Sequence, residues 1–142
     1  MTDIQFKFIP KNDILTIMPL MKMVSTEKNE ITLRKRVLEM AEQNYKCLGI
    51  YDADQLIGIC GLWFMTRHYC GKAVEPDHVF IEKDYQGQGI GNQLFEWIFD
   101  YCKQHNIEGC ELNTYVENTR SHKFYYNLGY EILGFHFLKI IE

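Results

Sequence analysis

Three glycines at alternate positions, in the run Tyr85-Gln86-Gly87-Gln88-Gly89-Ile90-Gly91-Asn92, constrain this chain more than any other feature. The run lies between a segment with the pattern of a strand and one with the pattern of a helix. Glycine costs about 0.5–1 kcal/mol relative to alanine in regular structure, so such a cluster indicates strained dihedrals or close approach of backbone to a ligand. Free N–H groups and the positive dipole end at a helix start favour a phosphate or pyrophosphate. The run therefore predicts a cofactor that carries phosphates.

Two better-known phosphate loops do not match this run. The Walker form requires Lys and Ser/Thr directly after its last glycine, and neither follows here. The dinucleotide fingerprint spaces its glycines as Gly-x-Gly-x-x-Gly, whereas these recur at every second position. A kinase or a dehydrogenase is therefore disfavoured, and a plain glycine-rich turn between strand and helix is the remaining alternative.

Length, charge and cysteine content narrow the class further. A chain of 142 residues fits one domain, which we place at residues 1–142. The net charge of −4 argues against a nucleic-acid partner, and five cysteines without a C-x-x-C pair favour free thiols over disulfides or a structural metal. No apolar run is long enough for a membrane span and the first residues lack a signal pattern, so we expect a cytoplasmic protein.

The hydrophobic pattern gives the order βααβββαβαβ and an α/β (α+β) fold class. Residues 29–44 have the spacing of an α-helix, with Ile31, Val37, Leu38 and Met40 facing the core. An earlier helix contains Pro19, which should kink it or end its first half. Asn12 or Asp13 is the expected cap of that earlier helix. The expected strands are 4–9, 46–52, 55–66, 74–83, 110–115 and 130–140, and the later helices are 92–105 and 118–128.

Two motifs resemble those of the GNAT (Gcn5-related N-acetyltransferase) superfamily. Residues 86–91 match its Gln/Arg-x-x-Gly-x-Gly/Ala signature, and His78-Val79-Phe80-Ile81 before them is similar to its fourth strand. Further on, Asn118-x-x-Ser121-x-x-Phe124-Tyr125-x-x-x-Gly129-Tyr130 resembles its Asn…Phe-Tyr…Gly-Phe/Tyr motif. The motifs cover about residues 74–135. The resemblance implies a mixed, mostly antiparallel central sheet flanked by helices, and an acetyl-CoA-dependent N-acetyltransferase that acts on a primary amine.

The resemblance also implies which residues bind acetyl-CoA. Backbone groups of Val79, Phe80 and Ile81 would pair with the pantetheine arm as if it were another strand, in a slot opened by splayed fourth and fifth strands. Asn118 would contact the same arm, and Tyr125 would lie near the sulfur. The pyrophosphate would be held by the loop residues Gln86, Gly87, Gln88, Gly89, Ile90, Gly91 and Asn92.

The chemistry of acetyl transfer needs a base and an acid. An amine attacks the thioester only when it is neutral, so an ammonium must first lose a proton. Glu75 is the first candidate for this base, with Asp77, His78 or a water as alternatives. The departing CoA thiolate needs a proton or a hydrogen bond, for which Tyr125 is the candidate, since Tyr126 would point about 100° away on a helix. Core packing is the ordinary alternative for Tyr125.

The acceptor site is expected near the first two helices and the cluster Trp63, Phe64, Arg67, His68 and Tyr69, which could equally pack on the core or on a second subunit. We expect a small-molecule amine, no metal, no membrane partner, and leave a homodimer open. Acetylation of a protein N-terminus or lysine is the rival within the class. A catalytically silent CoA-binding sensor is the rival from another class.

Overall fold

The strands of the central sheet follow one another in chain order, β1-β2-β3-β4-β5, in the computed structural model, which describes residues 2–142. The first four strands pair antiparallel, and β5 adds to β4 in parallel. This arrangement confirms the expected mixed, mostly antiparallel sheet. The strands are β1 (Ile4–Phe8), β2 (Tyr45–Asp52), β3 (Gln55–Arg67), β4 (Gly71–Ile81) and β5 (Gly109–Cys110).

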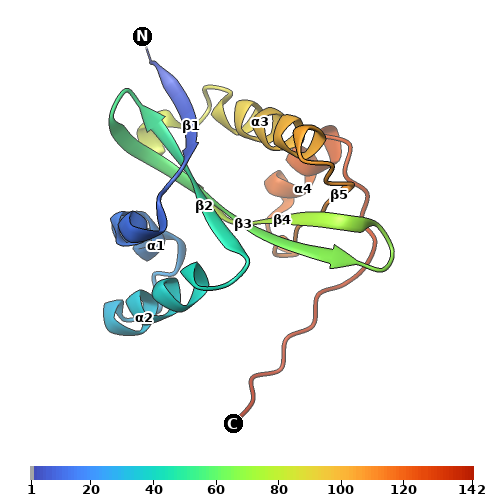
Figure 1. The fold of residues 1–142 in the computed structure, drawn as a ribbon, viewed down its shortest axis with the longest axis horizontal. Coiled ribbons are helices and arrows are strands. Elements are labelled where there is room, and N and C mark those ends of the chain that lie inside the picture. The colour runs from blue at the N-terminus through green and yellow to red at the C-terminus, as the bar shows by residue number, and fades with distance from the viewer. Residues whose placement is uncertain (1) are drawn as a thin grey trace.

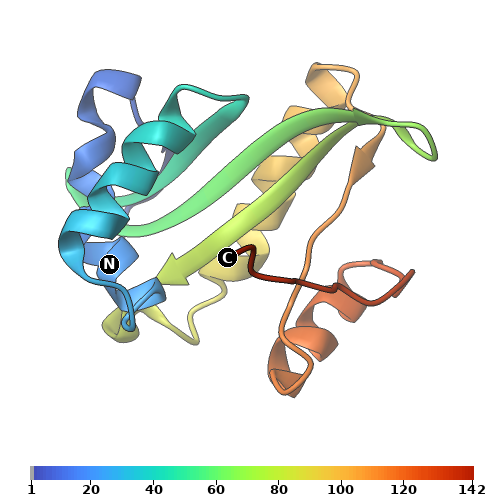
Figure 2. The same cartoon turned by 90° about the horizontal axis from the view of Figure 1, so that it is seen from below.

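Helices cover both faces of this sheet, as Figures 1 and 2 show. They are η1 (Lys11–Ile17), α1 (Met18–Val24), α2 (Glu30–Ala41), η2 (Lys83–Tyr85), α3 (Ile90–Gln104) and α4 (Thr119–Asn127), of which η1 and η2 are 3₁₀ helices. The helices α1 and α2 share one hydrophobic cluster with one face of the sheet, while α3 shares the second with the other face. None of the helices within residues 2–142 has the length and apolar character that a membrane crossing requires.

Of the two expectations for the first helices, the one about the cap is wrong and the one about Pro19 is confirmed. Asn12 and Asp13 do not cap: η1 begins after Pro10 without a side-chain cap, because the fixed φ of proline already turns the chain there. Pro19 lies in the first turn of α1, where its missing N–H has no intrahelical partner to lose, so the expected break does occur between η1 and α1.

The helix α2 faces the sheet with a different stripe from the one we expected. Val37 is fully buried as predicted, but Leu33 is the other buried side chain, and Ile31 is 83% exposed. Leu38 is also exposed, whereas Met40 packs partly against the core. Asn29 caps the helix by accepting a hydrogen bond from the Thr32 N–H at 2.8 Å.

The C-terminal third departs most from expectation. The strand expected at 110–115 shortens to β5, and residues 130–140 form no strand, so the final β of the expected order is absent. Their apolar pattern suits a strand, but in this structure they pair with no strand of the sheet. In Figure 1 this segment leaves the body of the molecule, and its end lies well away from the sheet.

Candidate functional site

A β-bulge in β4 shapes the centre of the molecule. Gly61 pairs with Asp77 while Ile59 pairs with Phe80, so β4 carries one residue more than β3 across this interval. His78 lies in the bulge with a φ of 36°, in the left-handed region that non-glycine residues rarely adopt. A Cβ on Gly61 would lie 2.1 Å from the His78 Nε2 atom, so only glycine leaves room for the ring.

The bulge precedes a stretch of β4 with one unpaired backbone edge. Pairing between β4 and β5 is limited to Ala73 with Gly109 and Val74 with Cys110. Two further bonds flank it, from the Glu108 N–H to the Lys72 carbonyl at 2.7 Å and from the Glu111 N–H to the Val74 carbonyl at 3.0 Å. Beyond that point the two strands part. After the bulge, Phe80 and Ile81 still pair with β3 on their other side. Their second edge is therefore free to bind an extended ligand in the manner of an added strand.

The glycine-rich loop lies at the end of the same strand and leads into α3. Gly87 and Gly89 have φ values of 76° and 81°, and an added Cβ at either residue would meet no atom within 4 Å. Glycine is required there for its dihedrals and leaves the surrounding space open. Gly89 is the N-cap residue of α3, and no side chain caps this helix end. The first amides of α3 thus remain free for an anion, which fits the pyrophosphate expected at residues 86–92.

Other residues of the loop hold its shape. The Gln86 side chain donates to the Ile81 carbonyl at 2.8 Å and that of Gln88 to the Asp84 carbonyl at 3.0 Å. Gly91 has a different reason to be glycine, because its Cβ would lie 3.3 Å from the ring of Phe124 in α4. Helix α3 begins at Ile90, two residues earlier than expected, so Gly91 and Asn92 lie in its first turn.

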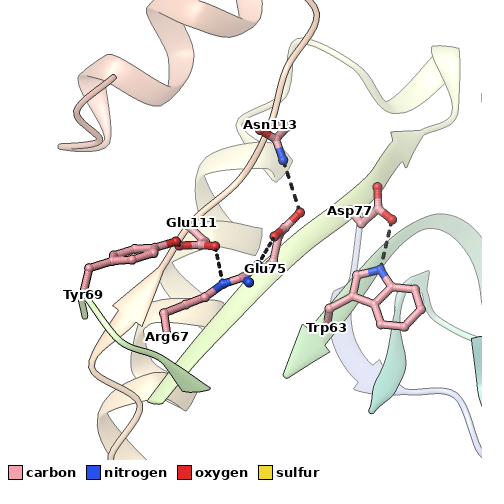
Figure 3. A network of polar contacts seen from close by, with 7 residues as sticks. All are labelled: Trp63, Arg67, Tyr69, Glu75, Asp77, Glu111 and Asn113. Carbon is pink, nitrogen blue, oxygen red and sulfur yellow. Dashed lines mark hydrogen bonds and ion pairs between the residues drawn. The ribbon is translucent and has the colours of Figure 1, made fainter. Parts of the chain in front are cut away.

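A polar network forms beside the point where β4 and β5 part, as Figure 3 shows. Arg67 joins two carboxylates: its Nη2 lies 3.4 Å from Glu75 Oε1 and its Nε lies 2.9 Å from Glu111 Oε1. Asn113 donates to the second oxygen of Glu75 at 3.4 Å, and the hydroxyl of Tyr69 donates to Glu111. The network has two carboxylates and one guanidinium, so its net charge is negative and favours a cationic ligand.

The Glu75 carboxylate has the properties of a base in this network. Its side chain is 23% exposed, and burial raises its pKa above the usual carboxyl range. The neighbouring Glu111 carboxylate adds to this rise, while Arg67 offsets part of it. A raised pKa means a stronger attraction for a proton, so Glu75 is suited to accept one from a bound ammonium.

The two alternative bases, Asp77 and His78, form hydrogen bonds within the protein. Asp77 accepts the indole N–H of Trp63 at 3.0 Å and the backbone N–H of His78 at 2.8 Å. The His78 Nε2 lies 2.5 Å from the Tyr45 hydroxyl, and its Nδ1 is buried without a hydrogen-bond partner. Burial lowers the pKa of His78, so its ring is neutral at pH 7 and enclosed. Glu75 is instead half-buried with a raised pKa, whereas Asp77 is exposed and already accepts two N–H groups.

Tyr125 lies in α4, and Asn118 is the residue directly before this helix. Tyr125 packs edge-to-face on Phe95 with ring centroids 5.5 Å apart, and burial raises its pKa to about 12. Tyr126 instead is 73% exposed. Asn118 is the N-cap of α4, where its Oδ1 accepts the Ser121 N–H at 3.3 Å, and its amide nitrogen stays available for another contact.

The structure divides the cluster at 63–69 and adds residues that the sequence did not single out. Arg67 and Tyr69 belong to the polar network, Trp63 bonds separately to Asp77, and Phe64 packs toward Tyr101 of α3. The residues that the sequence did not single out are Glu111 and Asn113 in the network and Tyr45 beside His78. Glu111 and Asn113 alternate with apolar neighbours in the chain, a period-2 signal that could have placed them on one face beside Glu75. Within residues 2–142, no three His, Cys, Asp or Glu side chains gather as a metal site.

Known proteins share the sequence pattern and the fold. The sequence model of the Acetyltransferase (GNAT) family matches residues 16–130. An aminoalkylphosphonate N-acetyltransferase of Salmonella typhimurium is 30% identical over 88 residues, which are 61% of this chain and 57% of that protein. The chain thus matches less than two thirds of the length of this curated relative. The structure of the aminoglycoside N-acetyltransferase AAC(6')-Iy with CoA superimposes with a TM-score of 0.82 at 14% identity, covering 99% of this chain and 96% of that one.

A second solved structure gives the same result. The possible acetyltransferase from Clostridium difficile 630 superimposes with a TM-score of 0.80 at 22% identity, over 98% of this chain and 97% of that chain. At such identities, these two likenesses concern the fold.

Proposed function

Because the chain belongs to the GNAT acetyltransferase family, we propose that it transfers an acetyl group from acetyl-CoA to a primary amine. One observation carries this proposal, namely that two features lie next to each other. Val79–Ile81 have a backbone edge without a partner strand, and the loop that follows has glycines with open space around them at the uncapped start of α3. An extended pantetheine arm needs the first feature and a pyrophosphate needs the second. Their adjacency on one strand suits a ligand that has both parts.

The geometry supports the same residues for binding acetyl-CoA as the family resemblance implies. Val79, Phe80 and Ile81 pair with the amides of the pantetheine arm, and the amides of residues 86–92 bind the pyrophosphate. Gln86 and Gln88 act by fixing the loop, since their side chains bond to carbonyls of their own chain. Asn118 reaches the arm from the opposite side through its free amide nitrogen.

Glu75 and Tyr125 divide the proton chemistry between them. Glu75 accepts a proton from the ammonium, directly or through a water, so that the neutral amine attacks the thioester carbonyl in a ternary complex. Tyr125 stays protonated at pH 7, because its pKa is about 12. A thiol has an ordinary pKa of about 8.5, so complete transfer from this phenol to the thiolate is uphill. Tyr125 therefore acts by donating a hydrogen bond to the departing thiolate.

The acceptor is a small-molecule amine that binds against the network of Glu75, Glu111 and Arg67. Its excess of carboxylates suits an ammonium group, and the aromatic side of Trp63 lies next to it. The named activities of the aminoalkylphosphonate and aminoglycoside enzymes are those of small-molecule acetyltransferases, which supports the same class here.

A thiol-release assay with acetyl-CoA tests the proposal. The panel comprises aminoalkyl compounds, diamines, an aminoglycoside, amino acids, and peptides with a free N-terminus or lysine. We expect turnover with at least one small amine and little with the peptides. Preference for a peptide would move the acceptor to the protein class, and tight acetyl-CoA binding without release for any amine would point to a silent sensor.

A further inference from the structure

The side chain of Arg67 connects three segments of the chain around Glu75. Arg67 is the last residue of β3, Glu75 belongs to β4, and Glu111 comes directly after β5. The guanidinium Nε lies 2.9 Å from Glu111 Oε1, and the Nη2 lies 3.4 Å from Glu75 Oε1. Figure 3 shows the guanidinium between the two carboxylates, beside the point where β4 and β5 part.

The two contacts of Arg67 differ in strength. A distance of 2.9 Å is that of an ordinary charge-assisted hydrogen bond, whereas 3.4 Å lies beyond the usual range. The hydroxyl of Tyr69 donates to the other oxygen of Glu111, so this carboxylate is held from two sides. Arg67 is therefore firmly bound to Glu111 and only loosely bound to Glu75, which leaves the Glu75 carboxylate able to take up a proton.

Arg67 and Glu111 act on Glu75 with opposite electrostatic effects. Burial is the largest cause of the raised pKa of Glu75, and the negative charge of Glu111 raises this pKa further. The positive charge of Arg67 lowers it, because a nearby cation stabilises the ionised carboxylate. The pair thus places one charge of each sign beside the candidate base.

Other polar groups face Glu75 from the elements packed against it. Asp77 on the same strand raises the pKa of Glu75 by its charge, while Asn113 donates to Glu75 Oε2 at 3.4 Å and lowers it. The helix α1 also packs against β4, and its charged residue, Lys22, pairs with Glu30 at 3.3 Å. Arg67 is thus the cation that offsets the negative charges at Glu75.

We propose that Arg67 and Glu111 are positioning residues for acetyl transfer, Arg67 by orienting the Glu75 carboxylate toward the acceptor amine and Glu111 by fixing Arg67 in place. This inference rests on the proposed function, in which Glu75 is the base. An arginine suits the task because its planar guanidinium offers N–H groups in fixed directions to two acceptors at once. The ammonium of a lysine is a single point charge and lacks this fixed geometry.

The opposite charges of the pair predict opposite changes in the pH dependence of kcat/KM. On the acid side kcat/KM rises as Glu75 loses its proton, and the midpoint of this rise, which we call the acid limb, follows the pKa of Glu75 in the free enzyme. Removing the charge of Arg67 should move the acid limb to higher pH, and removing that of Glu111 should move it to lower pH. A purely structural role would lower activity in both variants without opposite shifts.

The experiment measures kcat/KM against pH with one amine acceptor, whose own titration is the same for every variant and cancels in the comparison. The acid limb should move by roughly 0.5–1 pH unit, upward in Arg67→Met and downward in Glu111→Gln, since these side chains are partly exposed and their charges partly screened. Arg67→Lys keeps the charge and loses the planar geometry. Its acid limb should stay near that of the wild type while kcat falls by about 10-fold.

The matched control is Arg34→Met, at an exposed arginine of α2, which should change neither the acid limb nor kcat. Far-UV circular dichroism checks that each variant is folded, and Arg67→Gln, which keeps a hydrogen-bond donor without the charge, replaces Arg67→Met if the latter does not fold.

Glu75→Gln separates this inference from the assignment of the base, because it should abolish the acid limb. If Glu75→Gln abolishes it but the Arg67 and Glu111 variants leave it in place or move it in the same direction, the positioning roles are overturned and the base assignment stands. A native acid limb in Glu75→Gln would overturn both.

Discussion

Tyr125 and Tyr126 are adjacent in α4 and carry the same phenol, yet they face different surroundings. Tyr125 packs on Phe95, and burial raises its pKa to about 12, whereas Tyr126 is 73% exposed. The pair therefore offers a comparison in which the chemistry of the side chain is constant and only its place changes.

Replacing Tyr125 by Phe keeps the ring that packs on Phe95 and removes the hydroxyl. We expect stability and acetyl-CoA affinity to change little, while single-turnover rates fall by about 10- to 10⁴-fold, the range for loss of one acid or oxyanion-type donor. Tyr126→Phe, assayed with the same amine, should keep the native rate. Single-turnover measurement is needed because slow product release can hide a loss in chemistry. Equal rates for Tyr125→Phe and wild type would rule out the hydroxyl as the donor.

Replacing Glu75 by Gln should lower turnover by about 10²- to 10⁴-fold while making the folded protein relatively more stable at neutral pH. The folded-state pKa of Glu75 lies above its unfolded value, so the folded protein binds the proton more tightly. The free energy of unfolding of the wild type therefore falls as pH rises from the unfolded pKa through the folded one, and Gln removes this fall.

Urea unfolding of wild type and Glu75→Gln on both sides of the ordinary carboxyl pKa of about 4.3 checks the sign. The difference should be small below it and grow above it. Glu39→Gln, at an exposed carboxylate of α2, is the control and should change neither stability nor turnover. Full activity of Glu75→Gln would transfer the role of base to Asp77 or to a water.

At the scale of the element, the strained dihedrals of the glycine loop could be predicted because their signal is local. Positive φ values at Gly87 and Gly89 need no knowledge of the rest of the fold. The buried face of α2 was predicted wrongly, because it depends on contacts outside the helix. Leu33 and Ile31 both fit a helical apolar pattern, and only the packing of α2 against η1 and the sheet decides which of them is buried. Glu111 was missed because its partner Arg67 is 44 residues away in sequence.

Gly89 and Gly129 both need a positive φ, so comparing them distinguishes ligand binding by the loop from backbone strain. Gly89 and Gly129 have φ values of 81° and 95°, and neither has an atom within 4 Å of an added Cβ. Alanine should cost each protein about 1–2 kcal/mol in the free energy of unfolding. Only Gly89→Ala should also weaken acetyl-CoA binding, by at least roughly 10-fold, because it alters the amides at the start of α3. Isothermal titration calorimetry measures both affinities, and equal losses would contradict a pyrophosphate site in the loop.

At the scale of the whole molecule, Phe95 connects the core to the candidate site. It is 1% exposed, and its ring contacts those of Phe99, Phe124, Tyr125 and Tyr130. Phe95→Ala should cost about 3–5 kcal/mol in the free energy of unfolding, measured by urea denaturation, and should lower activity by loosening α4. Phe95→Leu, which keeps most of the volume, should lose less of both. A stable Phe95→Ala with native turnover would show that α4 is held by other contacts.

The number and order of the first nine elements could be predicted, because each has its own periodicity and turn residues. The hairpin between β2 and β3, for example, turns at Ala53 with a φ of 52° within the expected Asp52-Ala53-Asp54. The strand expected at residues 130–140 does not form, although Phe135 and Phe137 fit a strand pattern. A strand also needs a partner strand, and the sequence pattern does not say which one is available.

Chain order in the sheet has a consequence for synthesis. Each of the first four strands pairs with its immediate successor, and every member of the cluster beneath α1 and α2 lies between Ile9 and Phe80. Such local contacts form quickly, and a nascent chain folds from its N-terminal end. A ribosome that has released β4 has therefore delivered a nearly complete sheet but neither the loop nor α4. The sheet and one of its two hydrophobic cores are therefore able to form before the last of the residues that bind and react have been made.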